Sequence, residues 1–156
     1  MRLFVSLRPP PHAVQHLRAQ LPEWPTDPSR WHVTLAFLGD DAEPGRVHEQ
    51  LARPLAGPAG FDLRLEGVGA FARGPVWVGV GGDLPALHAL AAAVAGATGT
   101  ATGRPYRPHL TVGRRVPREP LQGYRGPDWR ATEVELVRSD LHPRVVHTVL
   151  ERYPLA

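Results

Sequence analysis

Two histidine–threonine pairs form the pattern in this sequence that is best suited to chemistry. One pair lies in the segment WHVTLAFLG and the other in PHLTVGR, and both segments are short apolar runs typical of strands. Side chains alternate between faces along a strand, so His32 and Thr34 share one face, as do His109 and Thr111. Each strand is therefore expected to present an imidazole and a hydroxyl on one side and apolar residues to the core on the other.

These four side chains together meet the chemical needs of a reaction at a phosphodiester. Histidine titrates near neutrality, so one neutral ring can accept a proton while a second, protonated ring donates one. Thr34 and Thr111 can donate hydrogen bonds to nonbridging phosphate oxygens, and Arg114 can supply positive charge. A metal site is the nearest alternative, but neither an HExxH pattern nor an acid-rich cluster accompanies the histidines. We therefore expect acid–base catalysis without a metal or cofactor.

The remaining histidines do not repeat the pattern. A lone histidine is more often a hydrogen-bonded structural residue than a catalyst. We interpret as structural the other six, namely His12, His16, His48, His88, His142 and His147.

Composition narrows the class of protein. All 18 basic residues are arginine, the net charge is +3, and there is no cysteine, which excludes disulfides and a thiolate nucleophile. Seven arginines lie within residues 104–130, against Glu119 and Asp128. The planar guanidinium group of arginine can bind two phosphate oxygens at once, so this segment could bind phosphates. A solvated surface loop would account for the same concentration of charge. The start of the chain resembles neither a secretion signal nor a membrane span, so we expect a cytoplasmic protein.

Hydrophobic periodicity predicts an α+β fold in one domain, residues 1–156. Adjacent strands require antiparallel pairing, and we expect two similar lobes of sheet, with helices on their outer faces and the two motifs facing each other across a central cleft. The expected strands are 1–7, 31–38, 61–66, 76–80, 108–114, 131–138 and 145–152, and the expected helices are 10–21, 43–55 and 84–97.

At these motifs the chain resembles the two-histidine phosphoesterase superfamily, and within it the RNA 2′,3′-cyclic phosphodiesterases once called 2′-5′ RNA ligases. The resemblance includes the segments RLFVSL, WHVTLAFLG, FDLRLEGVGAF, VWVGV and YRPHLTVGR and the closing VELVRSDL and VLERYPL. It implies that His32 donates a proton, that His109 accepts one, and that Thr34, Thr111 and Arg114 bind the phosphate. It also implies a two-lobed α+β fold, a mechanism without metal, and RNA ends as substrates.

One departure from the family pattern lies near the end of the chain. The family usually has a glycine followed by an aromatic residue before the last apolar run, whereas this chain reads RVVHTVL, with His147 near the aromatic position. The resemblance therefore does not predict which residues of the last strand contact a substrate.

The expected reaction is hydrolysis of a terminal 2′,3′-cyclic phosphate on RNA to a 2′-phosphate by a monomer, with 2′-5′ ligation as its reverse. Two alternatives stay open at this point. One is a phosphodiesterase of small cyclic nucleotides or of a cyclic phosphate of an ADP-ribose derivative. The other is a noncatalytic module that binds nucleotides or RNA.

Overall fold

A computed structural model describes residues 2–72 and 74–156, and its elements alternate between strands and helices. In chain order they are β1 (Arg2–Leu7), α1 (Pro11–Ala19), the 3₁₀ turn η1 (Pro28–Arg30), β2 (Val33–Gly39), α2 (Pro44–Ala52), β3 (Phe61–Ala70), β4 (Val76–Gly82), α3 (Leu84–Thr98), β5 (His109–Gly113), the 3₁₀ turn η2 (Glu119–Leu121), β6 (Trp129–Ala131), β7 (Glu133–Asp140) and β8 (Val146–Pro154).

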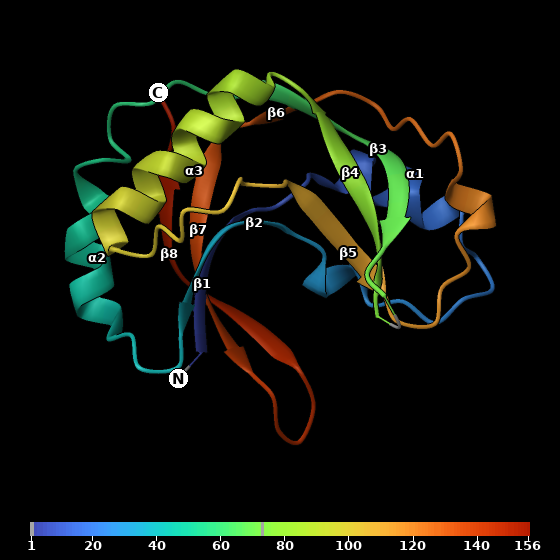
Figure 1. Ribbon diagram of the computed structural model, residues 1–156, viewed down its shortest axis with the longest axis horizontal. Helices are drawn as coiled ribbons and strands as arrows, with labels where there is room; N and C mark the ends of the chain where they lie inside the picture. The colour runs from blue at the N-terminus through green and yellow to red at the C-terminus, as the bar shows by residue number, and fades with distance from the viewer. Residues whose placement is uncertain (1, 73) are drawn as a thin grey trace.

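All eight strands belong to one curled antiparallel sheet. Their order across the sheet is β6-β3-β4-β5-β2-β1-β7-β8, so β5 and β2 are neighbours at its centre. These two strands share a single paired position, Val33 with Leu110, whereas β1 and β2 pair over five positions. Four strands therefore lie on each side of a narrow junction, and the strands bend away from each other around it (Figure 1).

The helices begin where the sequence supplies proline and partners for the free N–H donors. Each of the three helices has proline in its first turn, where a missing N–H costs nothing. The carboxylate of Glu43 accepts hydrogen bonds from the N–H groups of Gly45 and Arg46, and Asp83 accepts one from Ala86. These caps fix the starts of α2 and α3.

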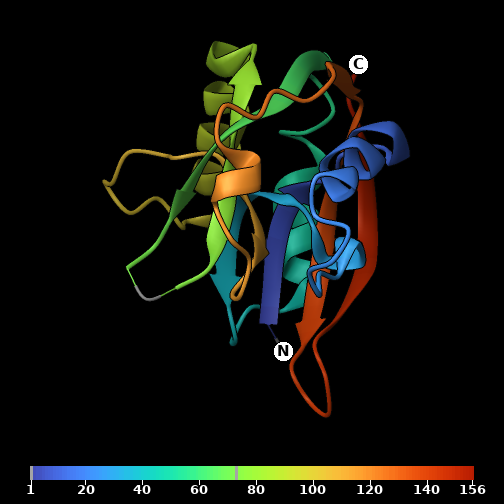
Figure 2. The ribbon, with the colours of Figure 1, turned by 90° about the vertical axis from the view of Figure 1, so that its right-hand side faces the viewer.

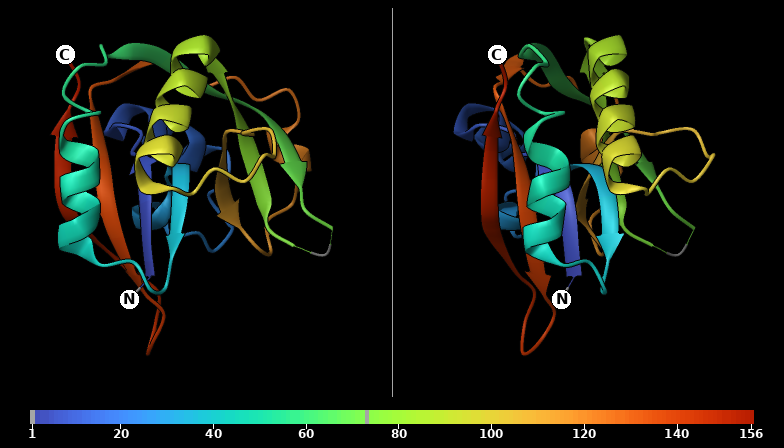
Figure 3. Two further views of the ribbon diagram at one scale, coloured as in Figure 1. Left: turned by 60° about the vertical axis from the view of Figure 1, so that its left-hand side comes forward. Right: turned by 90° about the vertical axis from the view of Figure 1, so that its left-hand side faces the viewer.

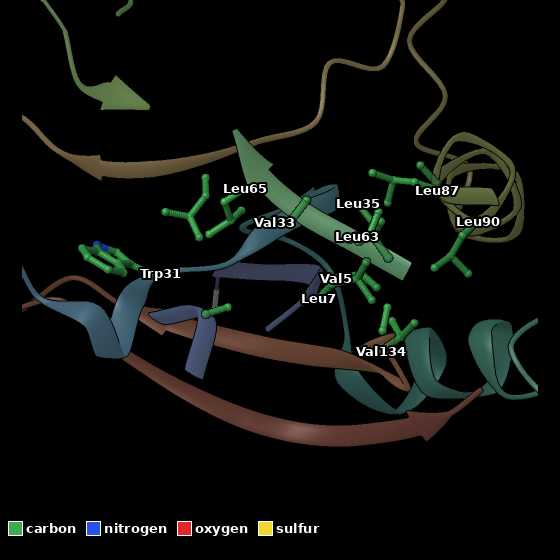
Figure 4. Packing of buried hydrophobic residues seen from close by; sticks show 14 of the residues in the cluster. Val5, Leu7, Trp31, Val33, Leu35, Leu63, Leu65, Leu87, Leu90 and Val134 are labelled. Atoms are coloured by element: carbon green, nitrogen blue, oxygen red, sulfur yellow. The ribbon is translucent and has the colours of Figure 1, made fainter. Parts of the chain in front are cut away.

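The core lies between the curled sheet and the helices. Helices α2 and α3 lie side by side against the half of the sheet that contains β1 and β2, while α1 lies apart from them (Figures 2 and 3). Side chains from β1, β2, β3 and α3 converge in one cluster, which includes Val33, Leu63 and Leu87, each with 0% exposure (Figure 4). Burial of this cluster anchors the backs of both motif strands.

The α+β class predicted from the sequence is confirmed, and so are the expected helices. The strands expected at 61–66 and 76–80 correspond to β3 and β4, which pair with each other in antiparallel fashion. Two details differ. The short strand β6 was not expected, and the strand predicted at 131–138 begins instead at Glu133. The division into two lobes stays a prediction, because the two halves belong to one sheet. The motif strands β2 and β5 are neighbours within this sheet.

Candidate active site

The single pair that joins β2 to β5 also arranges the motif residues. Because Val33 lies opposite Leu110 in an antiparallel pair, continuation of the register sets His32 beside Thr111 and Thr34 beside His109. Val33 and Leu110 are buried, so the four motif side chains project from the opposite face. The two motifs are thus related by an approximate two-fold axis through this pair.

Two side chains hold the motif strands together where backbone pairing is sparse. The indole Nε1–H of Trp31 donates to the carbonyl oxygen of Val112 at 3.2 Å. In the reciprocal direction, the hydroxyl of Tyr106 donates to the carbonyl oxygen of Thr34 at 2.7 Å. Trp31 is 1% exposed, so its bond is shielded from water. Each motif is therefore tied to the other by an aromatic residue that precedes its histidine.

The two imidazole rings are held in the same tautomer. His32 Nδ1 lies 2.6 Å from the carbonyl oxygen of Arg30, and His109 Nδ1 lies 2.8 Å from that of Arg107. A carbonyl only accepts, so Nδ1 carries the hydrogen in both rings. Neither Nε2 atom has a hydrogen-bond partner among the residues described, and each is available to accept or donate a proton.

A pocket of about 160 Å³ lies over the junction. Its lining contains all four motif residues, His32, Thr34, His109 and Thr111, which the sequence predicted would come together. The lining is completed by Arg2, Phe4, Phe37 and Ser139. A pocket of this size holds a phosphate group, with two imidazoles, two hydroxyls and a guanidinium around it.

Aromatic rings pack against both histidines. Phe4 stacks on His32, with ring centroids 4.4 Å apart and an interplanar angle of 21°. On the other side, Phe71 and Trp77 approach His109 at 5.5 and 6.0 Å. A Cβ atom at residue 69 would collide with the Trp77 ring, which explains the glycine there. These rings fix the histidines and exclude water from part of each imidazole.

Burial strongly affects the protonation of His32. Desolvation lowers the pKa of His32 to about 4, and the charges of His147, Arg8 and His109 act in the same direction, while the hydrogen bond to Arg30 opposes them. The ring is therefore neutral at neutral pH in the free protein. A proton donor at this position needs an anion in the pocket, because a nearby negative charge favours the protonated form.

Arg114 follows β5 directly and does not line the pocket. The strand expected over residues 108–114 included Arg114. That boundary is wrong, because β5 ends at Gly113 and both Arg114 and the following Arg115 are exposed in the bend that comes next. The arginine in the lining is Arg2, from β1. A phosphate contact from Arg114 stays a prediction.

Several residues of the site were missed by the sequence argument. His147, interpreted as structural, lies beside the His32 ring, with ring centroids 5.4 Å apart. Arg2, Phe4 and Ser139 reach the pocket because β1 is the neighbour of β2 and β7 is the neighbour of β1. Arg2 and Phe4 alternate along the first strand and so share one face, which was the only signal in the sequence that they act together. To place that face at the pocket requires knowledge of the strand order.

Comparison with known proteins agrees with this geometry. A family model described as the 2′-5′ RNA ligase superfamily matches residues 5–143. The chain belongs to the 2′-5′ RNA ligase superfamily. This confirms the resemblance seen in the sequence, and the match includes both His-x-Thr motifs. Among curated proteins, no sequence matches this member of the superfamily.

Solved structures of other proteins share the fold over nearly the full chain. TT0787 of Thermus thermophilus is 26% identical, with a TM-score of 0.81 over 99% of this chain and 98% of its own. E. coli LigT in its apo form is 26% identical, with a TM-score of 0.79 over 99% and 97%. LigT has also been solved with 3′-AMP, at 25% identity and a TM-score of 0.78 over 99% and 98% of the two chains.

Membership in this superfamily supports an enzyme with phosphodiesterase or ligase activity on RNA. Within residues 2–72 and 74–156, no helix is long and apolar enough to cross a membrane. The same residues contain no group of three or more histidine, aspartate or glutamate side chains placed to hold a metal ion.

Proposed function

We propose that this protein hydrolyses a terminal 2′,3′-cyclic phosphate on RNA to a 2′-phosphate. The observation that supports this most directly is the antiparallel pairing of the two motifs, which brings both histidines and both threonines to one phosphate-sized pocket. With Nδ1 of both rings engaged by carbonyl oxygens, each Nε2 is free for proton transfer. We further propose that the protein acts as a monomer in the cytoplasm.

In the proposed reaction the two histidines act at opposite ends of the phosphorus. His109 Nε2 accepts a proton from water as the water oxygen bonds to phosphorus. His32 Nε2 donates its proton to the 3′ oxygen as the bond between phosphorus and that oxygen breaks. Thr34 and Thr111 donate hydrogen bonds to the nonbridging oxygens, where charge builds. The reverse sequence, with a ribose hydroxyl in place of water, is 2′-5′ ligation.

Binding of the substrate prepares His32 for this role. The ring is neutral in the free protein, because burial holds its pKa at about 4. The negative charge of the cyclic phosphate opposes this effect and favours uptake of a proton at Nε2. The donor is therefore expected to become charged when the pocket is occupied.

The surroundings of the pocket suit a nucleotide. Phe37 lines it and is 64% exposed, which leaves its ring free to stack on a base. LigT, the structural relative from E. coli, binds 3′-AMP. Arg107 and Arg114 flank β5 and make no ion pair among the residues described, so both are available to a phosphate backbone.

The same chemistry fits a second substrate class, small cyclic nucleotides, and a binding module is the noncatalytic alternative. Purified protein treated with EDTA is incubated with an oligonucleotide that ends in a 2′,3′-cyclic phosphate and, separately, with a 2′,3′-cyclic mononucleotide. Consumption of the oligonucleotide at the higher kcat/KM supports the proposal. Faster consumption of the mononucleotide favours the second class, and binding without turnover favours the module.

The EDTA treatment carries a prediction of its own. Two histidines, two hydroxyls and arginine supply acid, base and charge, so the rate with EDTA should match the untreated rate within about twofold. Complete loss of turnover, with recovery on addition of zinc or manganese, would contradict the proposed mechanism.

Arginine substitutions test the phosphate contacts. A hydrogen bond from a charged donor is worth roughly 1.5–3 kcal/mol, so we expect Arg2→Ala and Arg114→Ala each to lower kcat/KM roughly 10- to 100-fold. Arg115→Ala is the matched control, because Arg115 is exposed beside Arg114 in the same bend. Equal losses in Arg114→Ala and Arg115→Ala would contradict a phosphate contact that is specific to Arg114.

A further inference from the structure

The His147 ring packs edge-on against the stacked rings of Phe4 and His32. Its ring centroid lies 5.4 Å from that of His32 and 5.1 Å from that of Phe4, with an interplanar angle of 71° to each. Phe4 and His32 are nearly parallel, at 21°, so the His147 ring stands across the edges of both. This contact limits rotation of the imidazole whose Nε2 faces the pocket.

The strand order brings His147 to the site from the far end of the chain. His147 pairs with Ser139 across β8 and β7, and Ser139 pairs with Arg2 across β7 and β1. Arg2 and Ser139 both line the pocket, so this row of three residues leads from the pocket to His147 on one face of the sheet. The β7–β8 hairpin, which carries Ser139 and His147, projects beyond the rest of the sheet (Figures 1 and 2).

Charged and titratable groups from three segments act on His147. Arg30 and Asp27 belong to η1 and the residue that caps this turn, Arg8 directly follows β1, and His32 directly precedes β2. Arg8 is bound to Glu135 at 3.0 Å and to the carbonyl oxygen of Ser29, so its position is fixed. Burial and the two arginines lower the pKa of His147, while Asp27 opposes them.

The two catalytic histidines differ in the rings that contact them. His109 has Phe71 and Trp77 as its ring neighbours, and neither of these titrates near neutrality. His32 alone of the two has another histidine in ring contact. The motifs are related by an approximate two-fold axis, so something outside them must make the two imidazoles unequal if one is to donate and the other to accept a proton.

We propose that His147 is a positioning residue for His32: its ring holds the imidazole against Phe4, and any proton on His147 opposes protonation of His32 until an anion enters the pocket. As a role in catalysis this rests on the proposed function. His147 thereby adds to the effect of burial, which already keeps His32 neutral in the free protein, so that His32 takes up its proton only when an anion occupies the pocket.

Titration of His32 in the free protein tests this inference without any substrate. The imidazole signals of the wild type, His147→Phe and His147→Ala are followed by NMR as a function of pH. His147→Phe keeps a ring at the position but removes its charge, so we expect the pKa of His32 to rise by roughly half a unit or more. His147→Ala also admits water and should raise it at least as far.

The matched control is His88→Phe, because the His88 ring meets Tyr106 at 5.4 Å in a similar edge contact on α3. This substitution should leave the titration of His32 unchanged. An unchanged His32 titration in folded His147→Phe would overturn the inference, since a purely structural His147 would lower stability and leave the titration alone.

The activity profile separates this inference from the proposed function. In His147→Phe the limb of the kcat/KM profile that reports His32 should move to higher pH by a similar amount. If the wild type turns over neither substrate but the His32 titration moves as expected, the proposed function fails and the positioning role stands. If turnover is normal and the titration does not move, the positioning role fails alone.

Discussion

Replacement of His32 or His109 by alanine is expected to lower turnover of a 2′,3′-cyclic phosphate by about 10²- to 10⁴-fold. General acid or base assistance has this typical value, and each substitution removes one of the two free Nε2 atoms at the pocket. The fold should persist, because Val33 and Leu110, which anchor the motif strands, remain in the core. Initial rates at saturating substrate, with circular dichroism to verify folding, give the comparison.

The double variant distinguishes a pair that works as a unit from two independent contributions. Groups that act in one step are not additive, so His32→Ala with His109→Ala should lose less than the product of the two single losses. His88→Ala is the control, because His88 is exposed on α3 and does not line the pocket. A folded single variant that keeps the wild-type rate would refute the two-histidine mechanism.

Stability should fall at acid pH because of His32. A histidine whose pKa is lowered by folding binds its proton more weakly in the folded state than in the unfolded state. Its contribution to the free energy of unfolding is therefore complete above the pKa that it has in the unfolded chain. This contribution is lost as the pH falls toward the pKa that it has in the folded protein. For His32 the window runs from pH 6.5 to about 4. The shift corresponds to at most about 3 kcal/mol of unfolding free energy.

Urea denaturation at several pH values isolates this contribution. Between pH 6.5 and about 4 the wild type should lose up to about 3 kcal/mol more than His32→Asn, in which this group does not titrate. Sulfate, which keeps its charge through this range, should reduce the difference if an anion in the pocket favours protonated His32. A pH dependence that is identical in the two proteins would contradict the assigned burial of the ring. His88→Asn should follow the wild type.

Local patterns were enough to predict the strands that carry the chemistry. The alternation around His32 and around His109 identified which side chains share a face, and burial of Val33 and Leu110 confirms it. The helices could be predicted for the same reason, since apolar periodicity and proline in the first turn depend on neighbours in sequence. The phosphate site could be proposed because all four of its central residues lie in two short segments.

Features that depend on strand order were beyond the sequence argument. That β2 and β5 are neighbours depends on packing between residues far apart in the chain, and the sequence did not predict that these two strands pair. His147 reaches His32 only because β8, β7, β1 and β2 are adjacent in that order. The prediction that Arg114 lies within a strand was wrong for a local reason, because β5 ends at Gly113.

The position of the phosphate in the product tests the central proposal most directly. An oligonucleotide with a 2′,3′-cyclic phosphate end is converted by the wild-type protein in the presence of EDTA, and the terminal phosphate is located by ³¹P NMR. If His32 protonates the 3′ oxygen while His109 activates water, the product carries a 2′-phosphate. A product with a 3′-phosphate would contradict the proposed mechanism. So would a cyclic end that remains unconverted at the highest enzyme concentration used.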